Sequence, residues 1–322
     1  MRNLLIWACL LGVIGYFGSK FYLHDKVSRN LDTVLAAAQP YVDVEYEDVS
    51  STLSGTLSID GITAQVAGFS DPVRIESVSI VTPGYFHLLG LAGIGGDKPG
   101  DFEIPEALGI AFDGISVAVD ADFMNVIEEA RKAQYGSRDA ADPASQCVGK
   151  NGFSADTLKR LGYDSLVVDA AVGYRKESGR LVFDFSTDIE DMYDMAVALT
   201  FDGMPTPQSV MTGSFQPRLV KGRMEYVDRS LEERVMKLCT ETEGLPAETV
   251  IAARVDAFQA VASTNEIEFD EYVIDPYLEF LNGGKQRFVI TAQPLEPVNL
   301  TQLGLYKPSD VPALLNLTAE AL

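Results

Sequence analysis

The hydrophobic pattern of the chain begins with an apolar run that differs from everything after it. Residues 4–19 carry no charge and consist mostly of Leu, Ile, Val, Gly and aromatic residues. Continued to Tyr22, such a run is long enough for a helix to cross the hydrocarbon core of a bilayer. The pattern therefore predicts a transmembrane anchor within residues 1–26. A cleaved signal peptide and a lipoprotein modified at Cys9 are the alternatives.

Small residues recur along one side of this predicted helix. They are spaced by four, three and four positions, which places them on one ridge: Ala8, Gly12, Gly15 and Ser19. A ridge of this kind lets two membrane helices approach closely. The alternative is the ordinary use of glycine in membrane helices.

The next pattern is helical and then alternating. Val27, Leu31 and Val34 keep helical spacing, so we expect a helical stalk over residues 27–40, ended by Pro40. From residue 41 to about 120 apolar and polar residues alternate, which predicts a β-rich module of antiparallel strands. Turns are expected at two glycine signals, Asp60-Gly61 and Phe112-Asp113-Gly114.

Residues 121–322 predict a meander of long strands followed by helices. Ser154 can cap a short helix. Strands are expected at 166–174, 181–185, 192–201, 209–215 and 219–227. Helices are then expected around 231–238, 251–262 and 270–281, with strands at 287–292 and 315–319 closing the chain. The predicted fold class is α+β: an N-terminal transmembrane helix, then a curved antiparallel sheet with packed helices.

Charge and cysteine content narrow the function. The chain has 47 acidic and 25 basic residues, a formal net charge of −22, which disfavours nucleic acid as a partner. Cys147 and Cys239 are the only cysteines after the predicted anchor. They fit one disulfide in an oxidising compartment, and two unrelated buried thiols are the alternative. We expect the body in the bacterial periplasm, anchored to the inner membrane by a single pass.

Catalytic and metal motifs are weak. The two histidines, His24 and His87, stand in no nucleophile or zinc pattern. The glycines between Gly90 and Gly100 lack the preceding strand and the Lys-Ser/Thr of a phosphate loop. A carboxylate cluster lacks the EF-hand spacing for calcium and reads as a solvated strand face: Asp184, Asp188, Glu190, Asp191 and Asp194. We assign no catalytic, cofactor or metal residue.

Residues 1 to about 81 resemble the AsmA-like proteins. The similarity rests on the apolar start, the stalk to Pro40, and the alternating segment from Leu53 to Ile62 followed by a strand carrying Val78-Ser79-Ile80. The resemblance implies a bacterial inner-membrane protein with a curved sheet whose apolar interior holds or conducts lipid. The short chain and the helical block of residues 230–281 depart from that plan.

Together these patterns favour a non-enzymatic envelope protein. We expect it to bind phospholipid or acyl chains, or to assist lipid transport or outer-membrane assembly, because an apolar sheet face must be covered by something. One alternative is a scaffold or accessory subunit that binds another envelope protein. A second is a hydrolase that uses carboxylates.

Overall fold

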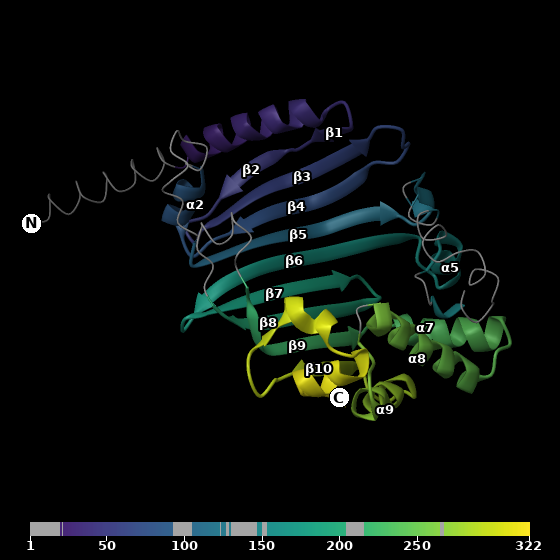
Figure 1. The fold of residues 1–322 in the computed structure, drawn as a ribbon. Coiled ribbons are helices and arrows are strands. Elements are labelled where there is room, and N and C mark those ends of the chain that lie inside the picture. The colour runs from purple at the N-terminus through teal and green to yellow at the C-terminus, as the bar shows by residue number, and fades with distance from the viewer. Residues whose placement is uncertain are drawn as a thin grey trace, which may run out of the picture. The chain divides into compact units, whose positions relative to one another are not determined.

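The computed structural model describes residues 20, 22–92, 105–122, 124–126, 129, 147–149, 153–203, 216–264 and 267–322 (Figure 1). The chain divides into two compact units, Met1–Asp113 and Gly114–Leu322. In each unit the described strands pair antiparallel and helices pack against them. The predicted combination of an antiparallel sheet with packed helices is therefore present.

The first unit begins with a helix at residues 22–38. Its other elements are β1 (Val42–Glu45), β2 (Asp48–Ser51), β3 (Thr56–Val66), β4 (Val73–Val81), α2 (Tyr85–Ala92) and the first part of β5 (Ala107–Ala118). The strand order is β1-β3-β4-β5, and β2 also pairs with β3. The first helix ends at Ala38, two residues before Pro40. Its Leu23 is buried with Val49 and Leu57 from the strands.

The predicted fold class is wrong in its first element. No helix among the described residues is both long and apolar enough to cross a membrane. The first described helix spans 17 residues and carries charges such as Asp25, Lys26 and Arg29, and it buries Leu23 against its own unit. The apolar run of residues 4–19, with the ridge of Ala8, Gly12, Gly15 and Ser19, lies outside the described residues.

Both glycine signals that predict turns in the first half of the chain lie inside strands. β3 runs through Gly61 and β5 runs through Gly114, with φ of 65° and 63°. A Cβ atom at Gly61 would lie 2.4 Å from Cγ of Glu47. Glycine adopts a positive φ without steric cost, so each of these residues changes the direction of its strand while the strand stays paired. The local motif resembles a turn, and pairing with neighbouring strands prevents one.

Long strands form the sheet of the second unit, which the end of β5 begins. The strands are β6 (Ser165–Glu177), β7 (Arg180–Ile189), β8 (Tyr193–Asp202), β9 (Arg218–Asp228), β10 (Arg287–Ala292), β11 (Val298–Asn299) and β12 (Leu317–Ala321). Their order is β5-β6-β7-β8-β9-β10-β12, and β11 pairs with β9. Ser178 and Gly179, both at positive φ, join β6 to β7 in a tight hairpin. The predicted strand at 209–215 lies outside the described residues.

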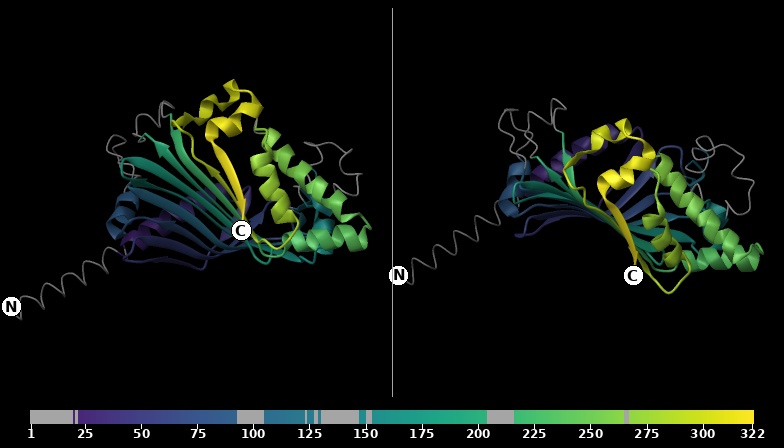
Figure 2. Two further views of the ribbon diagram at one scale, coloured as in Figure 1. Left: turned by 90° about the horizontal axis from the view of Figure 1, so that it is seen from below. Right: turned by 60° about the horizontal axis from the view of Figure 1, so that its bottom comes forward.

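The helices of the second unit lie between its strands in the sequence. They are α5 (Ala155–Arg160), α7 (Leu231–Lys237), the π-helix η2 (Leu238–Thr242), α8 (Ala247–Thr264), α9 (Glu271–Leu281), the 3-10 helices η3 (Leu300–Leu305) and η4 (Pro308–Asp310), and α10 (Val311–Leu315). Helices α7 to α9 and the C-terminal helices lie on the same side of the strands (Figure 2). The predicted cap Ser154 accepts a hydrogen bond from the N–H of Thr157 at 3.1 Å. The predicted strand at 315–319 begins too early, because α10 occupies Leu315 and Asn316 reverses the chain at a positive φ.

The predicted disulfide between Cys147 and Cys239 is present. Their Cα atoms are 5.6 Å apart across a sequence separation of 92 residues. Both cysteines are almost fully buried, in a cluster that includes Val235 from α7 and Val250 from α8. The bond therefore fixes residues 147–149 to the helices of the same unit.

Replacing both cysteines by serine is expected to lower the free energy of unfolding by roughly 4–5 kcal/mol, because the unfolded chain loses a long closed loop. Denaturant titration of the oxidised protein and of the Cys147→Ser/Cys239→Ser variant would measure the difference. Cys9→Ser is the matched control and should leave the midpoint unchanged. An equal loss of stability in the control would contradict the assignment.

Candidate functional site

The sheet of the second unit has one face that is almost entirely apolar, and we call it the apolar face. Directly opposed residues of antiparallel strands point to the same side, so the register assigns each side chain to a face. The members on β6 to β8 are Val168, Ala170, Val172, Tyr174, Leu181, Phe183, Phe185, Ile189, Tyr193, Met195, Val197, Leu199 and Phe201. Lys176 and Thr187 are the polar positions on these three strands. The face continues on β9 and β10 through Met224, Tyr226, Phe288 and Ile290.

The opposite face of the same strands is charged. Arg180 pairs with Asp202 at 3.2 Å, Arg175 with Asp184, and Arg287 with Glu225 at 3.2 Å. Exposed pairs of this kind contribute at most about 1 kcal/mol each, so they keep this face compatible with water more than they stabilise the fold. The two faces therefore differ in kind, and the apolar one is the face that needs a cover.

Helices α8 and α9 cover the apolar face over β9, β10 and β12. Phe288 is only 2% exposed and packs with Val273 and Phe280 of α9. Phe258 of α8 lies 4.4 Å from Tyr277 of α9, measured between ring centroids. This aromatic layer forms a dry core between the helices and the sheet.

A second cover lies at the end of the strands where β8 meets β9. Phe201 and Leu219 are buried there under Val311 and Leu315 of α10. Phe183 and Leu199 pack at the border of this cluster and are only partly buried. A third cluster, with Leu231 and Val235 of α7, receives Ile189 and Tyr193 at the opposite strand ends.

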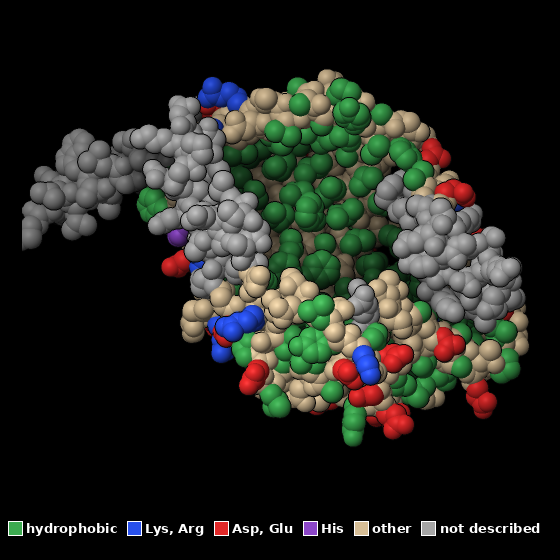
Figure 3. All heavy atoms as spheres, viewed as in Figure 1, with side chains coloured by type: hydrophobic (Ala, Val, Ile, Leu, Met, Phe, Trp, Pro, Cys, Tyr) green, Lys and Arg blue, Asp and Glu red, His purple; other side chains and the backbone are tan. Residues whose placement is uncertain are grey.

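Between these covers the apolar face carries side chains that stay partly exposed. We call them the open strip: Val168, Ala170, Val172, Phe185, Met195 and Val197. No buried cluster of the described chain includes them or is packed by them. Hydrophobic side chains line the hollowed part of the face over β6 and β7 in Figure 3. The second unit therefore has a bounded apolar surface that is partly exposed.

A buried ion pair joins the helices beside this face. Arg254 of α8 donates to Glu232 of α7 through two nitrogens, and a third contact goes to the carbonyl of Val148 at 3.0 Å. The side chains of Arg254 and Glu232 are 14% and 16% exposed. Burial lowers the pKa of Arg254, but the neighbouring Glu232 carboxylate raises it by more, so the pKa of Arg254 lies above its ordinary value and the guanidinium stays charged. The pair thus ties α7, α8 and the disulfide-bonded segment together.

Two tyrosines and a carboxyl group surround this ion pair. Burial, assisted by the charges of Glu232 and Asp228, raises the pKa of Tyr226, and burial raises the pKa of Tyr277 to about 12. Burial also raises the pKa of the Asp228 carboxyl, although Asp228 accepts a hydrogen bond from the N–H of Glu232 at 3.0 Å. The hydroxyl of Tyr226 is buried without a hydrogen-bond partner among the described residues. These groups are enclosed by packing, so we read them as structural.

The other sequence candidates do not converge on a reaction centre. His24 shares a hydrogen bond of 3.0 Å with Ser51, and burial lowers its pKa. Asp188 and Asp194 oppose each other on the charged face, where burial and the neighbouring Asp194 raise the pKa of Asp188. Among the described residues no group of three or more His, Cys, Asp or Glu is placed to hold a metal ion. Of the glycines around 90–100, only Gly90 lies within the described ranges.

Sequence reasoning missed the ion pair and the open strip. Glu232 and Arg254 each looked like an ordinary polar position on an amphipathic helix, and nothing local pairs residues 22 positions apart. The strip was visible as alternation on three strands, but alternation alone does not say which part a helix covers. The one sequence signal for the ion pair is Arg254, a basic residue that interrupts the apolar face of α8.

Comparison with known proteins covers part of this unit. A protein-family model described as "Uncharacterized protein" matches residues 186–322. The match includes β8 to β12, helices α7 to α10, and both members of the buried ion pair. No curated protein sequence matches the chain. The comparisons therefore supply no activity, and function has to be argued from the site.

Arg254→Met is expected to lower the free energy of unfolding by about 3–5 kcal/mol, because it leaves the Glu232 carboxylate buried without a counter-charge. The double variant Arg254→Met/Glu232→Met should recover most of that loss. Equilibrium denaturation of the two variants measures the difference. A double variant no more stable than the single one would contradict this account.

Asp228→Asn is expected to stabilise the protein at neutral pH. A carboxyl whose folded pKa is raised binds its proton more tightly when folded, so the native protein loses stability as pH rises above the ordinary carboxyl value of about 4. Asparagine keeps the acceptor for the Glu232 N–H and cannot ionise. The melting temperature of the variant should exceed that of the parent at pH 7 and equal it below about pH 4. A variant that loses stability as pH rises, relative to the parent, would refute the prediction.

Proposed function

We propose that the second unit binds a long acyl chain on the open strip and acts without catalysis, as a lipid-binding or lipid-transfer protein. The observation that carries the proposal is the partly exposed strip of Val172, Phe185, Val197 and their neighbours between covered ends. Apolar patches rimmed by polar or covered surface mark binding sites in soluble domains.

The dimensions of the strip admit an extended chain. From Val168 to Val172, the ends of the open strip on β6, the strand advances about 13 Å, at about 3.3 Å per residue. Across β6, β7 and β8 the strip is only about 10 Å wide, since neighbouring strands lie about 4.8 Å apart. The strip is thus slightly longer than it is wide, and an extended acyl chain can lie along it.

The energetics favour long chains. Burying one methylene contributes about 0.8 kcal/mol, and association costs roughly 4–15 kcal/mol in lost freedom. A chain of about twelve carbons gains about 9 kcal/mol at most, so shorter chains bind weakly. The lining is hydrocarbon except for Thr187, which lies between Ala170 and Met195, and the thioether of Met195, which adapts to irregular ligands.

The cellular setting follows from the disulfide and from the family resemblance. A buried Cys147–Cys239 bond supports an oxidising compartment, and the bacterial periplasm is our proposal. The resemblance of residues 1–81 to AsmA-like proteins implies the same class of ligand and stays a prediction. The predicted inner-membrane location depended on the transmembrane helix and is not proposed further.

Val197→Trp tests the proposal, because an indole there fills the strip. The full chain is purified from a bacterial periplasm without detergent, examined by native mass spectrometry, and titrated with dodecanoate. We expect lipid-mass adducts on the parent and dodecanoate binding weakened at least tenfold in Val197→Trp, the loss of roughly 1.4 kcal/mol or more.

The neighbouring Ala196 supplies the matched control. Ala196 lies on the charged face of the same strand, so Ala196→Trp should bind dodecanoate like the parent. A parent without adducts that also fails to bind dodecanoate would overturn the proposal. Equal weakening by both tryptophans would assign the effect to the strand and not to the strip.

A further inference from the structure

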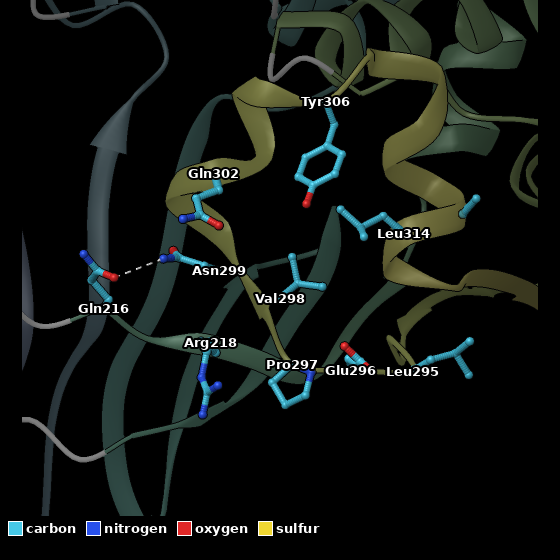
Figure 4. A pocket seen from close by; sticks show the side chains of 11 residues that line it. Gln216, Arg218, Leu295, Glu296, Pro297, Val298, Asn299, Gln302, Tyr306 and Leu314 are labelled. Atoms are coloured by element: carbon cyan, nitrogen blue, oxygen red, sulfur yellow. Dashed lines mark hydrogen bonds between the residues drawn. The ribbon is translucent and has the colours of Figure 1, made fainter.

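A polar pocket of about 590 Å³ lies in the second unit, apart from the open strip (Figure 4). The start of β9, strand β11, helix η3 and helix α10 enclose it. Its walls include Gln216, Val298, Asn299, Gln302, Tyr306 and Leu314. Its volume falls within the usual range of small-ligand sites, about 300–1,000 Å³.

The walls of this pocket combine amides with one aromatic ring. The Tyr306 hydroxyl points into the space toward Val298, and Leu314 faces it from α10 (Figure 4). Asn299 donates to Gln216 at 3.5 Å and accepts from the N–H of Thr301 at 3.0 Å. Neither the Gln302 amide nor the Tyr306 hydroxyl has a hydrogen-bond partner among the described residues. The pocket therefore offers the Gln302 amide and the Tyr306 hydroxyl to a ligand without breaking a hydrogen bond of the described residues.

Charge argues for a neutral ligand. Arg218 and Glu296 bring opposite charges to the rim, and Arg218 lies 3.9 Å from Asp202. A carboxylate at the rim and another next to the arginine weaken the attraction for an anion. Carboxamides and a phenol both donate and accept, which matches a ligand whose hydroxyl groups do the same.

We propose that this pocket binds a sugar. Its hydroxyl groups would exchange hydrogen bonds with Gln302, Asn299 and the Tyr306 hydroxyl. Val298 and Leu314 would contact its C–H groups. This inference goes beyond the acyl-chain site and does not require it.

Two sources of the sugar fit the same chemistry. Val298 lines the pocket and also packs in the cluster that Phe183 and Leu199 border, so the pocket lies next to the covered end of the apolar face. The sugar is then either free or the head of a glycolipid whose chain lies on that face.

The test uses three probes with the full chain: maltose, dodecyl maltoside below its micellar concentration, and dodecanoate. Gln302→Met removes the amide at nearly constant size, and Tyr306→Ala removes the ring and hydroxyl. Gln286→Met and Tyr272→Ala are matched controls, since both residues are exposed in the same unit and outside the pocket. Affinities are measured by calorimetry, and folding by thermal melting.

Each pocket variant is expected to weaken maltose and dodecyl maltoside at least about threefold, the loss of one neutral hydrogen bond, while the controls leave both unchanged. If the pocket variants weaken the binding of dodecyl maltoside but not that of maltose, the glycolipid source is supported. If neither sugar-bearing probe responds to either pocket variant, the inference is overturned. If the parent protein binds maltose but not dodecanoate, the acyl-chain proposal is overturned and the sugar proposal is supported.

Discussion

The second unit depends on keeping the apolar face of its sheet from water. Long antiparallel strands place every second residue on the same side, and here that side is mostly hydrocarbon from β6 to β10. Such a face is unstable alone, so the helices that follow in sequence fold back over it. The aromatic layer around Phe258, Tyr277 and Phe288 is the result. The charged opposite face needs no such cover.

Three kinds of contact fix the covering helices in place. The Cys147–Cys239 bond, the Glu232–Arg254 pair and the burial of Val235 all join α7 and α8 to the same core. A buried ion pair adds little net stability, but removing only one of its two partners is costly. The pair therefore specifies how the helices lie. With both ends of the sheet covered and fixed, the open strip between them is a preformed surface. A preformed surface binds without first being ordered, which reduces the entropy lost on binding.

Particular residues show where local patterns mislead. Gly61 and Gly114 predicted turns, yet each lies inside a paired strand, because partners far along the chain decide whether a positive φ reverses a strand or only bends it. The apolar run of residues 4–19 predicted a transmembrane fold, whereas the first described helix is charged and packs on its own unit through Leu23. The Ser154 cap was predicted correctly, since a cap acts within a few residues.

The sequence by itself determined the alternating strands, the order of helices after them and the available cysteine pair, because periodicity and residue type are local properties. Tertiary structure decided which part of the apolar face stays open and which residues meet. The bulge between Thr200 and Phe201 is one such decision, since it turns Leu219 toward the core in place of Val220. The pairing of Glu232 with Arg254 is another. Both depend on register and on contacts between distant segments, which no local pattern encodes.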